Sequence, residues 1–514
     1  PIELYPRLYA NYNILPIGLK MSSLSVSVNV AILNLLLTKA RQAMNFETII
    51  GLEVHAQLLT KSKMFCRCSA DYASAPPNTL VCPVCLGMPG VLPTINRQAV
   101  EYTIMTALTL NCAISDYTKF DRKNYPYPDL MKGYQISQYD APIGRHGWLT
   151  IEVNGEKKRV GITRVHLEED VAKLLHRTSS DGESYSLVDV NRSGVPLMEI
   201  VGEPDLRSPE AARQYLIKLR SILQYLGVST GNMEEGSFRC DANISIRPEN
   251  RPNPLAKVEV KNMNSFKAVY RALEYEAKRQ RKAAAEGRKL VQETRGWVEE
   301  KGRTVSQRSK EYAHDYRYFP EPDLPPLVLD REWVEEIRSK LPELPEARRA
   351  RFVAEYGLPL YDANLLTSSK AMAGYFEACL RTGMPQSLLP AKRAKMVANW
   401  LLGEFSRLLN ATNTGIEECK VSPEQFCQLL DLMHKGSISG AAAKLVFEEM
   451  FNTGKQAAEV IAQQGLSQIS DSQEIRLIIN EVLSTNARAV ADYRAGKTRS
   501  LAFLVGQVMR ATRG

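Results

Sequence analysis

Residues 50–58 read Ile-Gly-Leu-Glu-Val-His-Ala-Gln-Leu, and this stretch alternates apolar and polar side chains as a half-buried β-strand does. The apolar positions point to one face, while Glu53 and His55 share the other. A carboxylate or imidazole that faces a core loses its hydration unless it finds a partner. The stretch therefore predicts a sheet with one apolar face and one polar face, and the polar face needs an explanation.

A second stretch, residues 164–170, repeats this pattern with the letters Arg-Val-His-Leu-Glu-Glu-Asp. In a straight strand Glu168 lies on the same face as His166, and Glu169 lies on the opposite face. Both glutamates can share one site only if the strand bends there. Carboxylate and water oxygens are the ligands that Mg²⁺ prefers. Periodicity alone gives equal weight to a Mg²⁺ site and to an exposed, salt-bridged pair of strands.

Length and composition are those of an ordinary soluble protein. The chain has 514 residues, 44% of them hydrophobic, which is enough for about three domains with cores of their own. Its net charge of +9 permits a nucleic-acid partner without requiring one. The apolar stretch within residues 1–43 is too short and too polar to span a bilayer, and no clear secretory signal is present. We expect a disordered N-terminal extension, no membrane contact and a cytoplasmic location.

Four of the nine cysteines form two close pairs, Cys66-Arg67-Cys68 and Cys82-Pro83-Val84-Cys85. Two such pairs joined by a short loop can close a tetrahedral Zn²⁺ site. Disulfides are the alternative, but they are less common in a chain without an export signal. We therefore predict a structural Zn²⁺ site made by Cys66, Cys68, Cys82 and Cys85.

The organisation of the chain changes near residues 319–327, where four prolines exclude a helix and end the first domain. Before them, short strands alternate with turns, and Asn154-Gly155 is the clearest hairpin turn. Ser208 and Pro209 predict the N-cap and first position of a helix that ends before Gly227. A second helix is predicted over residues 265–286, and the chain after the prolines is predicted to be mainly helical.

Taken together, these segments resemble the GatB family, the B subunits of tRNA-dependent amidotransferases. The resemblance covers nearly the whole chain from Met44 and rests on residues 46–55, 120–125, 133–138, 164–170, 189–205, 233–248, 261–266, 315–323 and 503–507. It implies an α+β fold with a glutamine-synthetase-like antiparallel-sheet cradle domain over residues 44–330, into which the Zn knuckle of residues 66–85 is inserted. It further implies an all-α helical domain over residues 331–408 and an α-helical, YqeY-like, tRNA-binding tail over residues 409–514.

The resemblance also implies a reaction. The side-chain carboxylate of misacylated Glu-tRNA(Gln) or Asp-tRNA(Asn) is phosphorylated by ATP and then amidated with ammonia, which gives Gln-tRNA(Gln) or Asn-tRNA(Asn). The ammonia comes from a glutaminase A subunit, and a C subunit completes a heterotrimer. The sequence has no evident amidase signature of its own, which agrees with glutamine hydrolysis on another chain.

Phosphoryl transfer between two anions needs a divalent cation, and the acidic stretches supply candidate ligands for this cation. The candidate catalytic residues and Mg²⁺ ligands are Glu53, His55, Glu168 and Glu169, and the resemblance adds Glu235 as a further Mg²⁺ ligand. The candidate ATP- or phosphate-binding residues are Arg122, Lys123, Arg239 and Lys261. Each group keeps a plainer alternative, namely a surface charge run at residues 121–123, a turn-capping acid at Glu235 and a helix cap after Lys261.

The last 24 residues carry five basic side chains and one acid, a local charge of +4, which favours contacts with phosphate. Arg494, Lys497 and Arg499 are the candidate tRNA-binding residues that the resemblance implies, and solubility is the plainer role. Gly496-Lys497-Thr498 is not a P-loop, because Ala491 stands where the first glycine is required. The competing function is a non-catalytic, zinc-containing, tRNA-binding scaffold whose acidic residues form only salt bridges.

Overall fold

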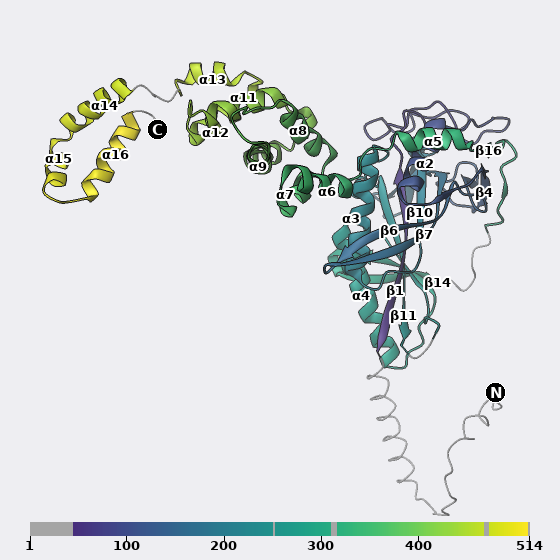
Figure 1. The fold of residues 1–514 in the computed structure, drawn as a ribbon. Coiled ribbons are helices and arrows are strands. Elements are labelled where there is room, and N and C mark those ends of the chain that lie inside the picture. The colour runs from purple at the N-terminus through teal and green to yellow at the C-terminus, as the bar shows by residue number, and fades with distance from the viewer. Residues whose placement is uncertain (1–44, 250–251, 310–315, 467–471, 512–514) are drawn as a thin grey trace, which may run out of the picture. The chain divides into compact units, whose positions relative to one another are not determined.

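The computed structural model describes residues 45–249, 252–309, 316–466 and 472–511 (Figure 1). These residues divide into two compact units, one of residues 45–218 with 232–331 and one of residues 219–231 with 332–511. The first unit is built on a large sheet and the second is helical, which confirms the predicted α+β class. The expectation for residues 1–43 lies outside the described part of the chain.

A nine-stranded sheet forms the frame of the first unit. Neighbouring strands are antiparallel, except that β12 and β13 run parallel. In spatial order the strands are β14 (Arg303–Ser309), β13 (Glu293–Val298), β12 (Val258–Lys261), β11 (Phe238–Pro248), β1 (Phe46–Gln57), β10 (Pro196–Gly202), β7 (Glu156–Glu169), β6 (Gly144–Val153) and β2 (Ala113–Ile114).

The apolar face of this sheet is covered by helices. Ile50, Leu52 and Val54 on β1 are fully buried, as their alternation predicts. Helix α2 (Arg97–Thr109) packs against β6 and β7, and α4 (Phe266–Ala285) packs against β11 and β14; α3 and α4 run along the sheet in Figure 1. The approach of α2 is close, because a Cβ atom added to Gly144 would lie 2.7 Å from the Cβ atom of Ala107. The polar face is therefore left for a site.

The local signals for helices and turns are confirmed. Helix α3 (Pro209–Leu226) begins at the predicted proline, and the Ser208 hydroxyl accepts a hydrogen bond from the N–H of Ala211 at 3.1 Å. Ser265 caps α4 in the same way. Asn154 and Gly155 join β6 to β7 with φ angles of 53° and 84°, the left-handed pair that a type I′ hairpin turn requires.

Smaller sheets and short helices complete the first unit around the polar face. They are the sheet β15 (Phe319–Pro320), β4 (Asp121–Asn124) and β5 (Tyr134–Ser137), the pair β16 (Leu327–Val328) and β3 (Tyr117–Thr118), the hairpin β8 (Lys173–Thr178) and β9 (Ser184–Asp189), and the single turns η1 (Val190–Arg192) and η2 (Glu299–Lys301).

The second unit has an aromatic core in which the rings of Phe405, Phe426 and Phe447 lie 5.1–5.4 Å apart. Within the described residues, none of the helices combines the length and the apolar character needed to cross a membrane. Its elements are α5 (Arg331–Ser339), α6 (Pro345–Tyr356), α7 (Leu360–Leu366), α8 (Lys370–Arg381), α9 (Pro390–Trp400), η3 (Leu401–Phe405), α10 (Ser406–Thr412), η4 (Ile416–Glu418), α11 (Pro423–His434), α12 (Gly440–Thr453), α13 (Ala457–Gln464), α14 (Ser472–Thr485), α15 (Ala487–Arg494) and α16 (Arg499–Ala511).

Candidate active site

The polar face of the sheet lines a cavity of about 500 Å³. The strand register explains why polar side chains gather there, since His55 on β1 lies opposite Glu199 on β10, which in turn lies opposite His166 on β7. Residues that face each other across neighbouring strands point to the same side of a sheet. The cavity is lined by Glu53, His55, Lys123, Ser137, Gln138, Tyr139, Arg164, His166, Glu199, Asp241, Asn243, Lys257, Glu259, Lys261, Tyr316 and Tyr318.

The structure brings together His55 and Glu199, which line this cavity, and the buried carboxylate of Glu168, which lies behind them. His55 Nε2 lies 3.5 Å from Glu199 Oε2 and 3.7 Å from Glu168 Oε1. Donor atoms of these three residues all lie within 4.8 Å of one another, close enough to ligate a single ion. His166 Nε2 reaches Glu199 from the other side at 3.4 Å. Ser137 donates its hydroxyl to Glu168 at 3.2 Å and so orients that carboxylate.

The charges of the cluster are strongly coupled. Burial alone would lower the pKa of His55, but the hydrogen bond to Glu199 and the charges of Glu199 and Glu168 raise it above its ordinary value. Burial would raise the pKa of Glu199, but His166 and His55 hold it well below its usual range. The cluster therefore keeps Glu199 ionised, as a metal ligand must be.

Glu53 lies on the same face of β1 and lines the cavity. It accepts a hydrogen bond from the Asn243 side-chain amide at 2.7 Å. The next cation along the cavity, Lys261, makes ion pairs with Asp241 and, at 3.3 Å, with Glu259. Burial would lower the pKa of Lys261, but these two carboxylates raise it. Of the predicted phosphate-binding residues, Lys261 thus reaches the cavity but is already paired.

Lys123 on β4 also points into the cavity, between aromatic rings. Its ammonium lies 5.1 Å from the ring centroid of Tyr316 and 5.9 Å from that of Tyr125. Burial would lower the pKa of Lys123, but the charges of Glu168 and Glu199 raise it. Lys123 is therefore a charged ammonium that faces the carboxylate cluster.

Two of the predicted phosphate-binding residues do not line the cavity. Arg122 forms a bidentate ion pair with Glu321, with both N···O distances 2.7 Å, and packs against the Tyr134 ring. Arg239 donates to Asp170 at 3.1 Å. Both guanidinium groups form ion pairs that join segments of the first unit, and these ion pairs give each positive charge a structural role.

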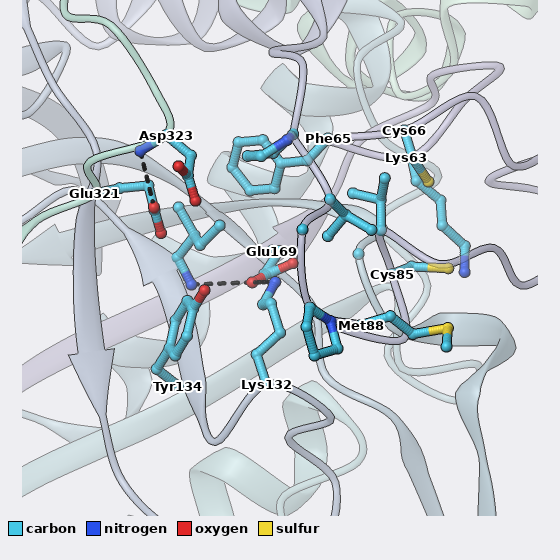
Figure 2. A pocket seen from close by; sticks show the side chains of 18 residues that line it. Lys63, Phe65, Cys66, Cys85, Met88, Lys132, Tyr134, Glu169, Glu321 and Asp323 are labelled. Atoms are coloured by element: carbon cyan, nitrogen blue, oxygen red, sulfur yellow. Dashed lines mark hydrogen bonds and ion pairs between the residues drawn. The ribbon is translucent and has the colours of Figure 1, made fainter.

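Glu169 lies apart from Glu168, because β7 runs unbroken through both residues. Its carboxylate faces a second cavity of about 210 Å³, accepts from the N–H of Ile136 at 3.0 Å and forms an ion pair with Lys132 (Figure 2). The bend that would have brought both glutamates to one ion is absent from this described strand. The structure therefore removes Glu169 from the predicted Mg²⁺ cluster.

Glu235 is also separate from the cluster. It is exposed in the turn before β11 and is not among the described residues that line the cavity. The cap of this turn is the Asn232 side chain, which accepts from the Glu234 N–H at 3.0 Å, so Glu235 keeps its predicted roles without a contact that decides between them.

The four paired cysteines converge beside the second cavity. Sulfur atoms of Cys66, Cys68, Cys82 and Cys85 all lie within 4.8 Å of one another. The Cys82 N–H donates to Cys85 Sγ at 3.1 Å. This contact, together with the hydrogen bond from Cys66, lowers the pKa of Cys85 to about 4. Four converging sulfurs with a stabilised thiolate fit a closed tetrahedral site.

Sequence reasoning missed Glu199 as a member of the cluster. Its signal was present, since Glu199 interrupts the apolar strand of residues 196–202 as Glu53 interrupts its own strand. Only strand order could place it, because β10 lies between β1 and β7 in space although it follows both in sequence.

The remaining sequence motifs carry no catalytic geometry. Residues 227–231 read Gly-Val-Ser-Thr-Gly, but they follow a helix and Ser229 is buried, whereas a nucleophile elbow follows a strand and exposes its serine. Arg494, Lys497 and Arg499 are exposed between and at the ends of α15 and α16, and Lys497 pairs with Asp492 at 2.8 Å.

Comparison with known proteins gives the family of the chain. The GatB/GatE catalytic domain family matches residues 48–335, and the GatB domain family matches residues 385–514. A protein of Dehalococcoides mccartyi is 62% identical over 471 residues, which cover 91% of this chain and 96% of that protein. Relatives from Thermomicrobium roseum and Moorella thermoacetica are 58% and 55% identical, each over 92% of this chain and over 96% and 97% of the relative. All three are named as the B subunit of aspartyl/glutamyl-tRNA(Asn/Gln) amidotransferase. Because family and identity match over nearly the whole chain, the protein belongs to the GatB family of amidotransferase B subunits.

Proposed function

We propose that this chain activates the side-chain carboxylate of Glu-tRNA(Gln), Asp-tRNA(Asn) or both with ATP and amidates it with ammonia. The observation that carries the proposal is that His55 and Glu199, which line the polar cavity together with Lys123, meet the buried Glu168 closely enough to ligate one ion. Membership of the GatB family supports the substrate class, because its relatives are named for aspartyl- and glutamyl-tRNA.

The chemistry has two steps: an oxygen of the substrate carboxylate attacks the γ-phosphorus of ATP with ADP as the leaving group, and ammonia then attacks the carbonyl carbon of the acyl phosphate. A carboxylate is a poor acyl donor, so phosphorylation first converts its oxygen into a leaving group, and ammonia then displaces phosphate at the carbonyl carbon. Charge builds up where the nucleotide phosphates meet the substrate carboxylate. Lys123 supplies a fixed positive charge at the cavity, where it can offset this charge.

The residues present fit a divalent cation. His55, Glu168 and Glu199 would hold it, with Glu53 as a further carboxylate within the same cavity. Carboxylates with room for water suit Mg²⁺, and the imidazole makes Mn²⁺ an acceptable substitute. When bound, the cation offsets the negative charge between phosphates and carboxylate. His166 and Ser137 orient Glu199 and Glu168 by direct contact.

The same proposal includes a structural Zn²⁺ at the four cysteines, a partner A subunit that hydrolyses glutamine and a C subunit. The relatives are each named as one subunit of an enzyme, which supports an assembly with other chains. Ser229, the serine of the Gly-x-Ser-x-Gly stretch, is buried and is not placed as a nucleophile for glutamine hydrolysis. The proposed source of ammonia is therefore a glutaminase A subunit, which a C subunit joins in a heterotrimer.

The test is the amidation of Glu-tRNA(Gln) by the enzyme reconstituted with its A and C subunits, with ATP and either glutamine or ammonium chloride as the donor. We expect both donors to support the parent enzyme. We expect His55→Ala and Glu199→Gln to lose amidation with both donors, by about 100-fold or more, because charge stabilisation is lost. Binding of tRNA should persist.

Glu183→Gln, at an exposed position before β9, is the matched control and should keep full activity. Unchanged amidation in His55→Ala and Glu199→Gln would remove the site from the reaction. It would leave the alternative of a zinc-containing tRNA-binding scaffold.

A further inference from the structure

Arg164 is a cation of the cavity that neither the reaction nor the fold has yet explained. It lies on β7 two residues before His166, on the same face of the strand, and it lines the cavity. Its Nε atom is buried and has no hydrogen-bond partner among the described residues. A guanidinium donor removed from water without an acceptor is costly, and such groups are rare in folded proteins.

The strands beside Arg164 offer it no counter-charge. Its cross-strand neighbours are Val201 on β10 and Arg145 on β6, so one neighbour is apolar and the other is a second cation. Like charges placed opposite each other destabilise a sheet. Among the described residues, no carboxylate lies within ion-pair distance of Arg164, whereas Arg122 and Arg239 each have one.

The position of this unpaired group is informative. Arg164 shares the cavity with Lys123, and both cations lie close enough to the Tyr318 hydroxyl for their charges to act on it. The carboxylate cluster of His55, Glu168 and Glu199 belongs to the same face of the sheet. Lys123 thus faces the carboxylate cluster, whereas Arg164, in the same cavity, has no anion of its own among the described residues.

We propose that Arg164 is an anion-binding residue of the reaction, which receives an oxyanion of the substrates in a bidentate hydrogen bond. This inference rests on the proposed function. A planar guanidinium matches the two oxygens of a carboxylate or of a phosphoryl group, a geometry that a lysine ammonium does not reproduce. The oxyanion is either a phosphate of the nucleotide or the side-chain carboxylate of the aminoacyl group. Arg164 exchanges no proton in this role and takes no part in bond making.

Two variants and one control test the inference in the assembled enzyme. Arg164→Gln removes the charge, and Arg164→Lys keeps the charge but not the fork. Arg159→Gln is the control, because Arg159 lies on the same strand but stacks on Trp148, 3.8 Å from its ring centroid, and does not line the cavity. The measurements are the affinity for ADP with Mg²⁺ in the absence of tRNA, and kcat and KM for Glu-tRNA(Gln).

We expect Arg164→Gln either to weaken ADP binding or to raise the KM for Glu-tRNA(Gln), by about 10- to 100-fold, which is the effect of losing a hydrogen bond to a charged group. Arg164→Lys should recover only part of this loss. Weakened ADP binding identifies the phosphate as the anion. A raised KM for Glu-tRNA(Gln) with unchanged ADP affinity identifies the carboxylate. Arg159→Gln should match the parent in both measurements.

The inference is overturned if Arg164→Gln stays within twofold of the parent in both measurements, or if Arg164→Lys recovers fully, since a point charge would then suffice. Thermal unfolding and zinc content should equal those of the parent, which separates a binding defect from a folding defect. A parent enzyme that does not amidate Glu-tRNA(Gln) would instead reject the proposed function and leave the ADP measurement as the test of Arg164.

Discussion

At the scale of single residues, Glu168 and Glu169 carry the same carboxylate to opposite faces of β7. Successive side chains of a strand point to opposite faces. Glu168 therefore lies beside His55, whereas Glu169 lies beside Lys132. Replacing each of them by glutamine makes the same chemical change on opposite faces of one strand, so the two variants are matched.

We expect Glu168→Gln to weaken divalent-cation binding by about 10-fold or more, because a neutral amide replaces one of two cluster carboxylates. Glu169→Gln should bind the cation as the parent does. Titration of Mn²⁺ followed by electron paramagnetic resonance measures both affinities. Equal weakening in the two variants would mean that both glutamates reach the ion, contrary to the observed strand.

Asp170, the next residue, supports the site through fixed ion pairs. It is buried, accepts from Gln57 at 2.7 Å and from Arg239 at 3.1 Å, and lies 3.7 Å from Arg192. Burial would raise the pKa of Asp170, but Arg239 and Arg192 hold it below its usual value. The ionised form is therefore the one that the fold stabilises.

Asp170→Asn should lower the free energy of unfolding at pH 7 by about 2 kcal/mol, less than a fully buried pair would lose, because the Arg239 side chain stays 33% exposed. A carboxyl group whose pKa is lower in the folded than in the unfolded state stabilises the fold at a pH above its unfolded pKa. This stabilisation disappears as the pH falls through its folded pKa. The difference between variant and parent should therefore shrink below about pH 4. Urea unfolding at pH 7 and at acid pH measures it.

Asp181→Asn, at an exposed turn, is the control for this comparison and should stay within about 0.5 kcal/mol of the parent. A difference for Asp170→Asn that persists undiminished in acid would show that the charge of Asp170 is not what stabilises the fold.

At the scale of elements, none of the helices and strands of the described chain falls within residues 66–85, so we expect the four cysteines to fix this knuckle. We expect about one tightly bound Zn²⁺ per chain, as one closed four-sulfur site implies. Replacement of Cys82 and Cys85 by serine should release the metal, and replacement of Cys112 and Cys240, buried elsewhere, should not. Elemental analysis after dialysis against a chelator measures the content. A parent chain without zinc would contradict the expectation.

Elements and their faces could largely be predicted from the sequence, whereas the partners in the site could not. The caps at Ser208 and Ser265 and the turn at Asn154-Gly155 are local signals, and the structure confirms them. Glu199 joins His55 only through the order of strands in the sheet, which periodicity does not encode. Arg122 is a predicted phosphate ligand, but in the structure it is paired with Glu321. Glu321 is distant in the chain, so local sequence patterns do not reveal this pairing.

At the scale of the whole molecule, the net charge of +9 is too small and too evenly distributed to direct a tRNA by itself. The local excess at the C-terminal end is different. Arg494 and Arg499 are exposed there, whereas Lys497 shares its charge with Asp492. If these groups contact phosphates, their removal must change how binding responds to salt, because each contact releases counterions.

The double variant Arg494→Gln, Arg499→Gln should therefore reduce the slope of log affinity against log salt concentration by about 1.4–1.8, with the larger loss of affinity at low salt. The measurement is filter binding of Glu-tRNA(Gln) to the assembled enzyme between low and moderate salt. Lys289→Gln with Lys301→Gln, two exposed cations of the first unit, is the charge-matched control and should leave the slope unchanged. If both pairs reduce the slope equally, overall charge rather than the C-terminal helices attracts the tRNA, and solubility becomes the better account of these residues.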